Sequence, residues 1–358
     1  MIWNNSRAAA RSIQQPGAAT SIALGALAAL AVAACHQSTP GLAVVSVTDL
    51  GALGDPSAPR LYRDGGSSVL LGGRLLWSFG DTLFPFAAQD GVQLRTNTAA
   101  LAAPDAPAAL SEPLDAKGAP LQFVPFTADE AAFNAQNAKD GVRIALWPGA
   151  MVPQGADRAL VIVDKVEVHP GTLNYKGLST ELALATPGST SATRAGTLFA
   201  SPEPRFSHGA VVRDGTLYLY ACTPGSQCRI ARAPLAQATQ RSAYQFACSS
   251  GWSADLGCAA PLVPGSTAGH AVSWNAHLGR FLSASTPGFS TDVLLRTAPA
   301  PEGPWSDPVV AAHAPSAIYA VYLHDELQSA DGKRVAVSYS RATGALSGEV
   351  RLLQLELE

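Results

Sequence analysis

The chain has 358 residues, of which 47% are hydrophobic and 14% are charged, and its formal net charge is −3. This length is sufficient for a large core, and a weakly acidic chain without a basic run is not expected to bind nucleic acid. Gly (32 residues) and Pro (26 residues) are spread among short apolar runs, a composition that favours strands and turns over long helices.

Residues 1–34 are typical of a signal peptide. Arg7 and Arg11 precede an apolar stretch rich in Ala and Leu, which is short for a membrane span and is followed by small residues. The Val-Ala-Ala-Cys sequence that ends at Cys35 resembles the lipobox of bacterial lipoproteins, which implies cleavage before Cys35 and lipidation of that residue. An ordinary secretory signal with a chance cysteine is the alternative. We therefore expect residues 35–44 to be a tether, lipid-anchored at the cell envelope on the outer membrane or periplasmic face.

Residues 63–82 predict a β-hairpin that brings two aspartates together. An apolar run leads to Gly72 and Gly73, which suit the two-residue turns that join antiparallel strands, and a second apolar run leads back. In this register the numbers of facing residues sum to 145, so Asp64 faces Asp81. Like charges at directly opposed positions are destabilising, and we therefore expect this pair to have a function.

Four later segments repeat the shape of this hairpin, with an apolar run, a turn and an alternating apolar strand. They are residues 142–168, 208–221, 270–285 and 319–340. Five such hairpins predict an all-β fold, a five-bladed β-propeller over residues 45–358. A β-sandwich is the main alternative.

Two segments are assigned to the connections of this ring. Residues 105–137 are rich in Ala, Pro and Asp, and we expect an insertion between the first two blades with a short helix at 128–137. Residues 43–47 are expected to complete the last blade and so close the ring.

The four remaining cysteines predict two local disulfides in an exported protein. Cys222 and Cys228 flank a short Pro/Gly loop, T-P-G-S-Q, and Cys248 and Cys258 flank the loop S-S-G-W-S-A-D-L-G. A single four-cysteine metal site is the alternative, but the sequence has no C-x-x-C spacing.

Polar residues just before each inner strand should meet at one mouth of the propeller channel. The candidate substrate-binding residues at or near this mouth are His208, His270, Tyr319, Asn97, Glu203 and Trp147. Asp164 and Glu167 lie within or just beyond a strand, and we expect them to be surface or blade-edge charges.

Asp64 and Asp81 are the candidate catalytic residues. Two close carboxylates have different pKa values, so one can donate a proton to a glycosidic oxygen while the other attacks carbon or activates water. Asx-turns or a structural Ca²⁺ site are alternatives for these aspartates, although no D-x-D-x-D loop accompanies them. No cofactor is otherwise expected.

The run from Arg63 to Thr82 resembles the opening motif of the bacterial family catalogued as domain of unknown function 4185. The N-T-A-A-L at 97–101, W-P-G at 147–149, G-P-W-S-D-P at 303–308 and I-Y-A at 318–320 are similar to it as well. The resemblance implies a five-bladed propeller and a possible glycoside hydrolase, since related members in glycoside hydrolase family 183 are endo-acting D-arabinanases. Their catalytic acids in the opening motif correspond to Asp64 and Asp81.

These features lead to two hypotheses. The first is a lipid-anchored extracytoplasmic glycoside hydrolase, a monomer whose partners are a polysaccharide, arabinan-like or other, and the membrane. The second is a non-catalytic surface propeller that binds glycan or protein.

Overall fold

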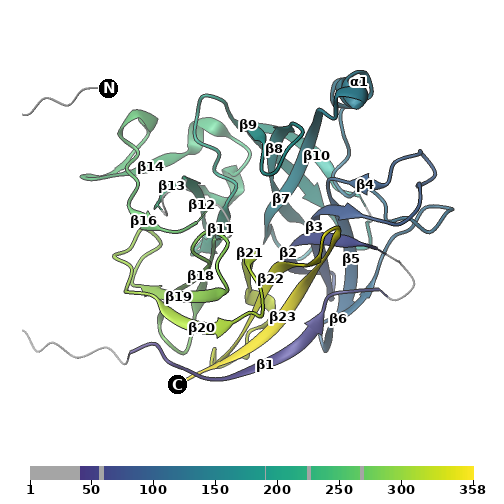
Figure 1. Ribbon diagram of the computed structural model, residues 1–358. Coiled ribbons are helices and arrows are strands. Elements are labelled where there is room, and N and C mark those ends of the chain that lie inside the picture. The colour runs from purple at the N-terminus through teal and green to yellow at the C-terminus, as the bar shows by residue number, and fades with distance from the viewer. Residues whose placement is uncertain (1–40, 56–59, 190, 224–226, 267–269) are drawn as a thin grey trace, which may run out of the picture. The chain divides into compact units, whose positions relative to one another are not determined.

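The computed structural model describes residues 41–358 except 56–59, 190, 224–226 and 267–269. The predicted signal peptide and Cys35 lie outside the described residues. From Leu42 to Glu358 the chain forms one unit, in which five antiparallel sheets surround a common centre (Figure 1). The predicted five-bladed β-propeller is confirmed.

Each blade is one sheet whose first strand lies nearest the axis. The first three blades contain β2 (Tyr62–Leu71), β3 (Arg74–Leu83), β4 (Leu94–Arg95), β5 (Thr98–Ala103) and β6 (Ala106–Ser111); β7 (Arg143–Pro153), β8 (Ala159–Val168), β9 (Tyr175–Ala185) and β10 (Thr193–Ala200); and β11 (Gly209–Arg213), β12 (Thr216–Thr223), β13 (Gln227–Pro234), β14 (Gln245–Cys248), β15 (Gly251–Ser253) and β16 (Val263–Pro264). The last two contain β17 (His270–Asn275), β18 (Arg280–Ser285), β19 (Asp292–Ala298) and β20 (Val309–His313); and β21 (Ile318–His324), β22 (Arg334–Gly344), β23 (Ser347–Leu357) and β1 (Val44–Ala52).

The inner strands contact one another in the cyclic order β2, β7, β11, β17, β21 and back to β2. Between neighbouring blades the apolar faces form the core, as where Leu76 of β3 belongs to the same buried cluster as Val161 of β8. This arrangement leaves a channel along the axis with the same end of each inner strand at the same mouth.

The first hairpin turns at Gly72 and Gly73, whose φ angles of 57° and 78° suit the predicted turn. Leu71 pairs with Arg74, and the predicted register holds back to Ser67 opposite Ser78.

The ring closes by pairing the two ends of the described chain. β1 runs antiparallel to β23, with Val47 opposite Leu355. The expected closure of the last blade by residues 43–47 is therefore confirmed.

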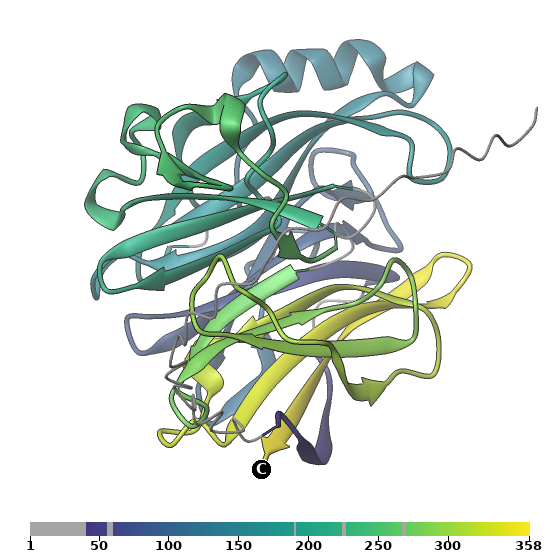
Figure 2. The same cartoon turned by 90° about the vertical axis from the view of Figure 1, so that its left-hand side faces the viewer.

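The connection between the first two blades differs in part from the expected insertion. Residues 106–111 form β6, the outer strand of the first blade, so the crossing begins after it. The helix α1 (Ala128–Asn137) lies where the sequence placed it, on the outside of the second blade (Figure 2). Its capping-box residue Glu130 forms ion pairs with Lys165 and Arg194 of that blade, which hold the helix there.

The remaining helices are single 3₁₀ turns. They are η1 (Ala138–Asp140), η2 (Leu235–Gln237), η3 (Arg241–Ala243), η4 (Leu256–Cys258) and η5 (Asp325–Leu327). Nowhere in the described part of the chain is a helix long and apolar enough to cross a membrane.

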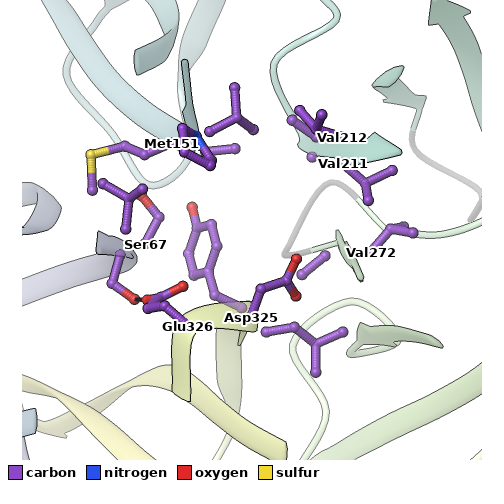
Figure 3. Close-up of a pocket in the computed structure, with 18 of the residues that line it drawn as sticks. Ser67, Met151, Val211, Val212, Val272, Asp325 and Glu326 are labelled. Atoms are coloured by element: carbon purple, nitrogen blue, oxygen red, sulfur yellow. Dashed lines mark hydrogen bonds between the residues drawn. The ribbon is translucent and has the colours of Figure 1, made fainter. Parts of the chain in front are cut away.

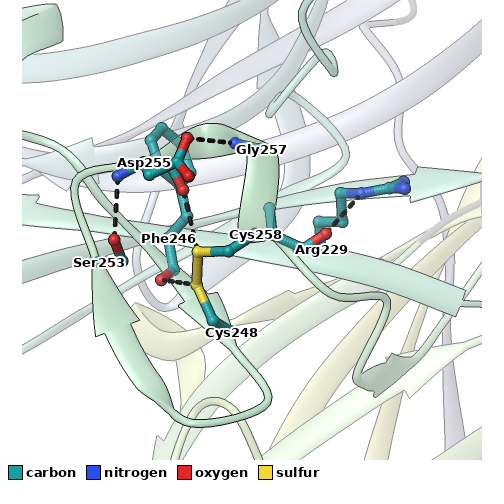
Figure 4. The surroundings of a disulfide bond; sticks show 8 residues. Arg229, Phe246, Cys248, Ser253, Asp255, Gly257 and Cys258 are labelled. Carbon is teal, nitrogen blue, oxygen red and sulfur yellow. Dashed lines mark hydrogen bonds between the residues drawn. A yellow bond between two sulfur atoms is a disulfide. The ribbon is translucent and has the colours of Figure 1, made fainter.

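Both predicted disulfides are present. Cys222 and Cys228 face each other on β12 and β13. Cys248 at the end of β14 is joined to Cys258 in η4 (Figure 4), where the Asp255 carboxylate accepts a hydrogen bond from the Gly257 N–H. Each bridge therefore closes a loop of the third blade.

Candidate functional site

The two aspartates lie at the same end of the first hairpin, but a bulge changes how they face each other. Arg63 pairs with Thr82 and Gly65 pairs with Phe79, so Asp64 alone lies opposite both Gly80 and Asp81. Asp64 therefore lies opposite Asp81 as predicted, but it shares that position with Gly80 and does not form the predicted one-to-one pair. The extra residue re-aims the side chains at the strand end, as bulges do next to functional sites.

Two glycines make this bulge sterically possible. A Cβ atom at Gly80 would lie 2.3 Å from Asp64 Oδ1, so the Asp64 carboxyl group occupies the space that a side chain at position 80 would need. A Cβ atom at Gly65, whose φ is +78°, would lie 2.7 Å from the Gly80 nitrogen. Close approach of the two strands here therefore depends on both glycines.

Asp64 is surrounded by neutral donors. The Tyr319 hydroxyl donates to Asp64 Oδ2 at 2.9 Å, and the Tyr62 hydroxyl donates to the same oxygen at 3.3 Å. Tyr319 is directed here by an irregularity of β21, where Ala320 has a φ of +49°. Burial raises the pKa of Asp64 well above its usual range, and the nearby charge of Asp81 raises it further, while a backbone N–H bond from Asp81 opposes the shift.

Asp81 has a cationic partner that Asp64 lacks. Trp147 Nε1 donates to Asp81 Oδ1 at 2.9 Å, and the Arg143 guanidinium lies 3.3 Å from Oδ2. Both side chains come from β7 of the neighbouring blade. Burial raises the pKa of Asp81, but the Arg143 charge and the Trp147 hydrogen bond oppose that shift.

The different surroundings of the two carboxyl groups determine which of them holds a proton that they share. The negative charge is more stable on Asp81, where a guanidinium and an indole N–H stabilise it. The proton is more stable on Asp64, and phenol hydroxyls can accept as well as donate a hydrogen bond there. The pair thus combines an acid and a carboxylate in one site.

The pair lines a cavity of about 1070 Å³ at one mouth of the channel. Asp164 of β8 also lines it and is held by Arg205, whose Nη1 lies 2.6 Å from Asp164 Oδ1. The expectation that Asp164 is a surface or blade-edge charge is therefore wrong. Its acidic side chain within the apolar run of β8 was the available signal, but its partner is 41 residues away.

Four of the six predicted binding residues line the same cavity. They are His208, Glu203, Tyr319 and Trp147. His208 Nδ1 accepts a hydrogen bond of 3.2 Å from the Cys222 N–H, and burial lowers the pKa of His208, which favours the neutral ring. Glu203 forms an ion pair with Arg241.

The other two predicted binding residues lie elsewhere. His270 is 1% exposed and packs edge-on against Tyr220 at 5.0 Å between ring centroids, and burial lowers its pKa to about 3. Asn97 is buried between the first two blades, where it accepts from the Val124 N–H and donates to the Leu146 carbonyl. Asn97 therefore lines neither cavity of the channel, whereas His270 lies at the wall of a second, smaller cavity.

The opposite end of the channel holds a second, smaller cavity of about 340 Å³ (Figure 3). Asp325 and Glu326 enter it from the turn after β21, and Tyr322 lines both cavities. The Ser68 hydroxyl donates to Glu326. Partial removal from water and the adjacent Glu326 raise the pKa of Asp325 to about 7.

A metal site is not formed by the described side chains: among them, no group of three or more His, Cys, Asp or Glu residues is placed to hold an ion.

Comparison with solved structures supports the propeller architecture. A protein from Bacteroides ovatus ATCC 8483 described as a candidate hydrolase is 15% identical with a TM-score of 0.59, over 83% of this chain and 86% of that one. An exo-β-1,3-galactanase from Phanerochaete chrysosporium is 13% identical with a TM-score of 0.55, over 89% of this chain and 65% of the galactanase. At these identities the likeness is one of fold.

The sequence comparisons identify the family. No curated protein matches the sequence. Residues 37–344 match the family described as Domain of unknown function (DUF4185), which covers most of the propeller and its opening aspartate motif. The chain belongs to this family.

Proposed function

We propose that this chain is a glycoside hydrolase in which Asp64 is the general acid and Asp81 is the ionised partner. The observation that carries the proposal is the unequal surroundings of two adjacent carboxyl groups in one cavity. Asp64 accepts hydrogen bonds from tyrosine hydroxyls, whereas Asp81 forms an ion pair with Arg143 and accepts a hydrogen bond from Trp147. Glycosidic cleavage needs this combination of a protonated and an ionised carboxyl group.

In the proposed reaction the glycosidic oxygen lies next to Asp64, which donates its proton as the bond to the anomeric carbon breaks. The positive charge that develops on the sugar is stabilised by the Asp81 carboxylate. Asp81 then either forms a bond to the anomeric carbon or takes a proton from an attacking water. The anomeric form of the first product, followed by NMR, distinguishes these two courses.

The likeness to a glycan-degrading propeller supports the substrate class. The galactanase with this fold has been crystallised with β-1,3-galactotriose, an oligosaccharide. The cavity of about 1070 Å³ around the acid pair is large enough for several sugar units at a time.

Anchoring to the cell envelope through lipid on Cys35 is part of the proposal and rests on the sequence alone. Incorporation of labelled palmitate into the wild-type chain, and its loss in Cys35→Ser, is the expected result. Equal labelling of both chains would contradict the anchor.

The hydrolase proposal is tested by release of reducing ends from a panel of plant, fungal and mycobacterial polysaccharides by the purified full-length chain. Asp64→Asn and Asp81→Asn should each reduce turnover by about 10² to 10⁴-fold, because each removes one of the two required carboxyl groups. Asp64→Asn should melt near the wild-type temperature, because a protonated carboxyl group and an amide are both neutral and similar in shape, whereas Asp81→Asn also loses the ion pair with Arg143 and is the less stable of the two.

No product from any glycan, or undiminished turnover in both variants, would contradict the hydrolase. Glycan binding without turnover would instead support the non-catalytic propeller.

A further inference from the structure

Each carboxyl group of the acid pair accepts a hydrogen bond from an aromatic side chain, and a second aromatic ring packs against that side chain. On the Asp64 side, Tyr319 donates to the carboxyl group, and the Phe289 ring lies 5.6 Å from the Tyr319 ring between centroids. Phe289 belongs to the connection between β18 and β19 in the fourth blade, and it is 51% exposed. A half-exposed benzene ring therefore stands one residue away from the proposed acid.

The Asp81 side is arranged in the same way. Trp147 donates to Asp81, and the Tyr175 ring meets the Trp147 ring edge-on at 5.2 Å. Tyr175 is the first residue of β9 in the second blade and is 38% exposed. The second and fourth blades are not neighbours in the ring, so the two outer rings approach the acid pair from different sides.

These two rings are exceptional for their exposure. Of all Trp, Tyr and Phe side chains in the described part of the chain, only Tyr175 and Phe289 are exposed, and both line the acid cavity. Leaving aromatic surface in water has a cost that packing in a core would avoid. Its presence on two sides of the cavity that holds the acid pair points to a ligand with apolar faces, and sugar rings present such faces through their C–H groups.

The charges of the cavity indicate which glycans fit. Three of its four basic side chains have carboxylate partners: Arg143 has Asp81, Arg205 has Asp164, and His169 has Glu167. The fourth is His208, whose pKa is lowered by burial, which favours the neutral ring. A uronate or sulfate group would therefore meet paired cations together with the negative charge of the acid pair. A neutral glycan avoids this repulsion.

We propose that Phe289 and Tyr175 are stacking platforms that bind two sugar units of a neutral glycan chain, one on each side of the acid pair. This inference rests on the proposed function, because it assigns binding residues to the same cavity. The platforms do not touch the reacting atoms, so they contribute to substrate affinity and not to proton transfer.

The first test measures binding without turnover. The full-length Asp64→Asn chain is run through native gels containing arabinan, galactan or polygalacturonate, alone or with Phe289→Ala or Tyr175→Ala added. Each alanine should weaken retardation by a neutral glycan about tenfold, the scale of one lost aromatic contact. Phe289→Tyr and Tyr175→Phe keep the ring and should bind normally, as should Leu346→Ala, which removes an exposed apolar side chain outside the cavity.

The second test separates KM from kcat in the otherwise wild-type chain. Both alanine variants should raise KM on the bound polymer about tenfold and change kcat little. A merely structural role would instead lower the melting temperature of the alanine variants.

The two proposals fail differently. Platform-dependent binding without product from the wild-type chain would contradict the hydrolase and support the platforms. Hydrolysis with unchanged KM in both alanine variants would overturn the platforms and leave the hydrolase standing. Stronger retardation by polygalacturonate than by the neutral glycans, or no retardation by any of them, would also overturn this inference.

Discussion

The axial channel carries a pair of carboxyl groups at each end, and the two pairs are built differently. Asp64 and Asp81 come from two strands, and a neighbouring blade supplies Arg143 and Trp147 to one of them. Asp325 and Glu326 are consecutive residues of one turn. The first pair therefore has fixed and unequal partners, whereas the second has no cation of this kind among the residues lining its cavity. Only the first arrangement separates an acid from a carboxylate, which is why we assign chemistry to that end.

Among the substitutions that compare the two pairs without removing Asp64 or Asp81, the largest effect should come from Gly80→Ala, which changes no charge. The new Cβ atom would lie 2.3 Å from Asp64 Oδ1 and must displace the carboxyl group. A displacement of about 1 Å costs on the order of 10²-fold in rate, so turnover on the best glycan should fall by at least that factor.

The control for Gly80→Ala is the other end of the channel. Asp325→Asn and Glu326→Gln should leave turnover within about twofold, since neither residue lines the acid cavity. Wild-type turnover in Gly80→Ala, or an equal loss in the Asp325 and Glu326 variants, would remove the distinction between the two pairs.

A smaller effect, in pH dependence, should follow from Arg143→Met. Loss of the guanidinium charge raises the pKa of Asp81, whose ionised form the reaction requires. The acidic limb of the kcat/KM profile should therefore move to higher pH, and the loss of activity should be greatest in acid. The basic limb, which reports deprotonation of Asp64, should move less. A uniform loss at every pH would show that Arg143 only positions substrate.

The smallest effect should be on stability, through Asp325. Its pKa of about 7 is raised above the unfolded value, so its contribution to the free energy of unfolding is complete below about pH 4 and is lost as the pH rises through 7. Asp325→Asn removes this titration, and the melting temperature should then fall less between pH 5 and pH 8 than in the wild type. Because Asp325 is exposed, solvent screening reduces the size of the difference. Parallel melting curves would indicate that Asp325 titrates normally.

The propeller and the turn of the first hairpin were predictable because their signals are local. Two glycines with positive φ define the turn, and residue numbers then fix the pairing back to Ser67 opposite Ser78. The bulge was hidden because Arg63 and Thr82 beyond it return to the same sum of 145. Compensating irregularities of this kind depend on how Asp64 packs over Gly80, which no short sequence pattern records.

The partners of the acids were harder to predict because they come from other blades. Arg143 is 62 residues from Asp81, and Tyr319 is 255 residues from Asp64. His270 shows the converse error. It looks equivalent to His208 in the repeat, but His208 precedes its strand, whereas His270 is the first residue of β17 and pairs with Ser285 inside the sheet. A shift of one position was enough to move it away from the predicted mouth, to the wall of the smaller cavity.

The closure of the ring by β1 and β23 sets an order of events during synthesis. Of the described strands β1 is synthesised first, but its hydrogen-bonding partner β23 is synthesised last. Until Ser347–Leu357 has emerged, β1 remains an unpaired edge that carries Val45 and Val47. Nascent chains of this protein are thus exposed to wrong strand pairing until β23 has been made, and a truncation before β23 would leave β1 permanently unpaired.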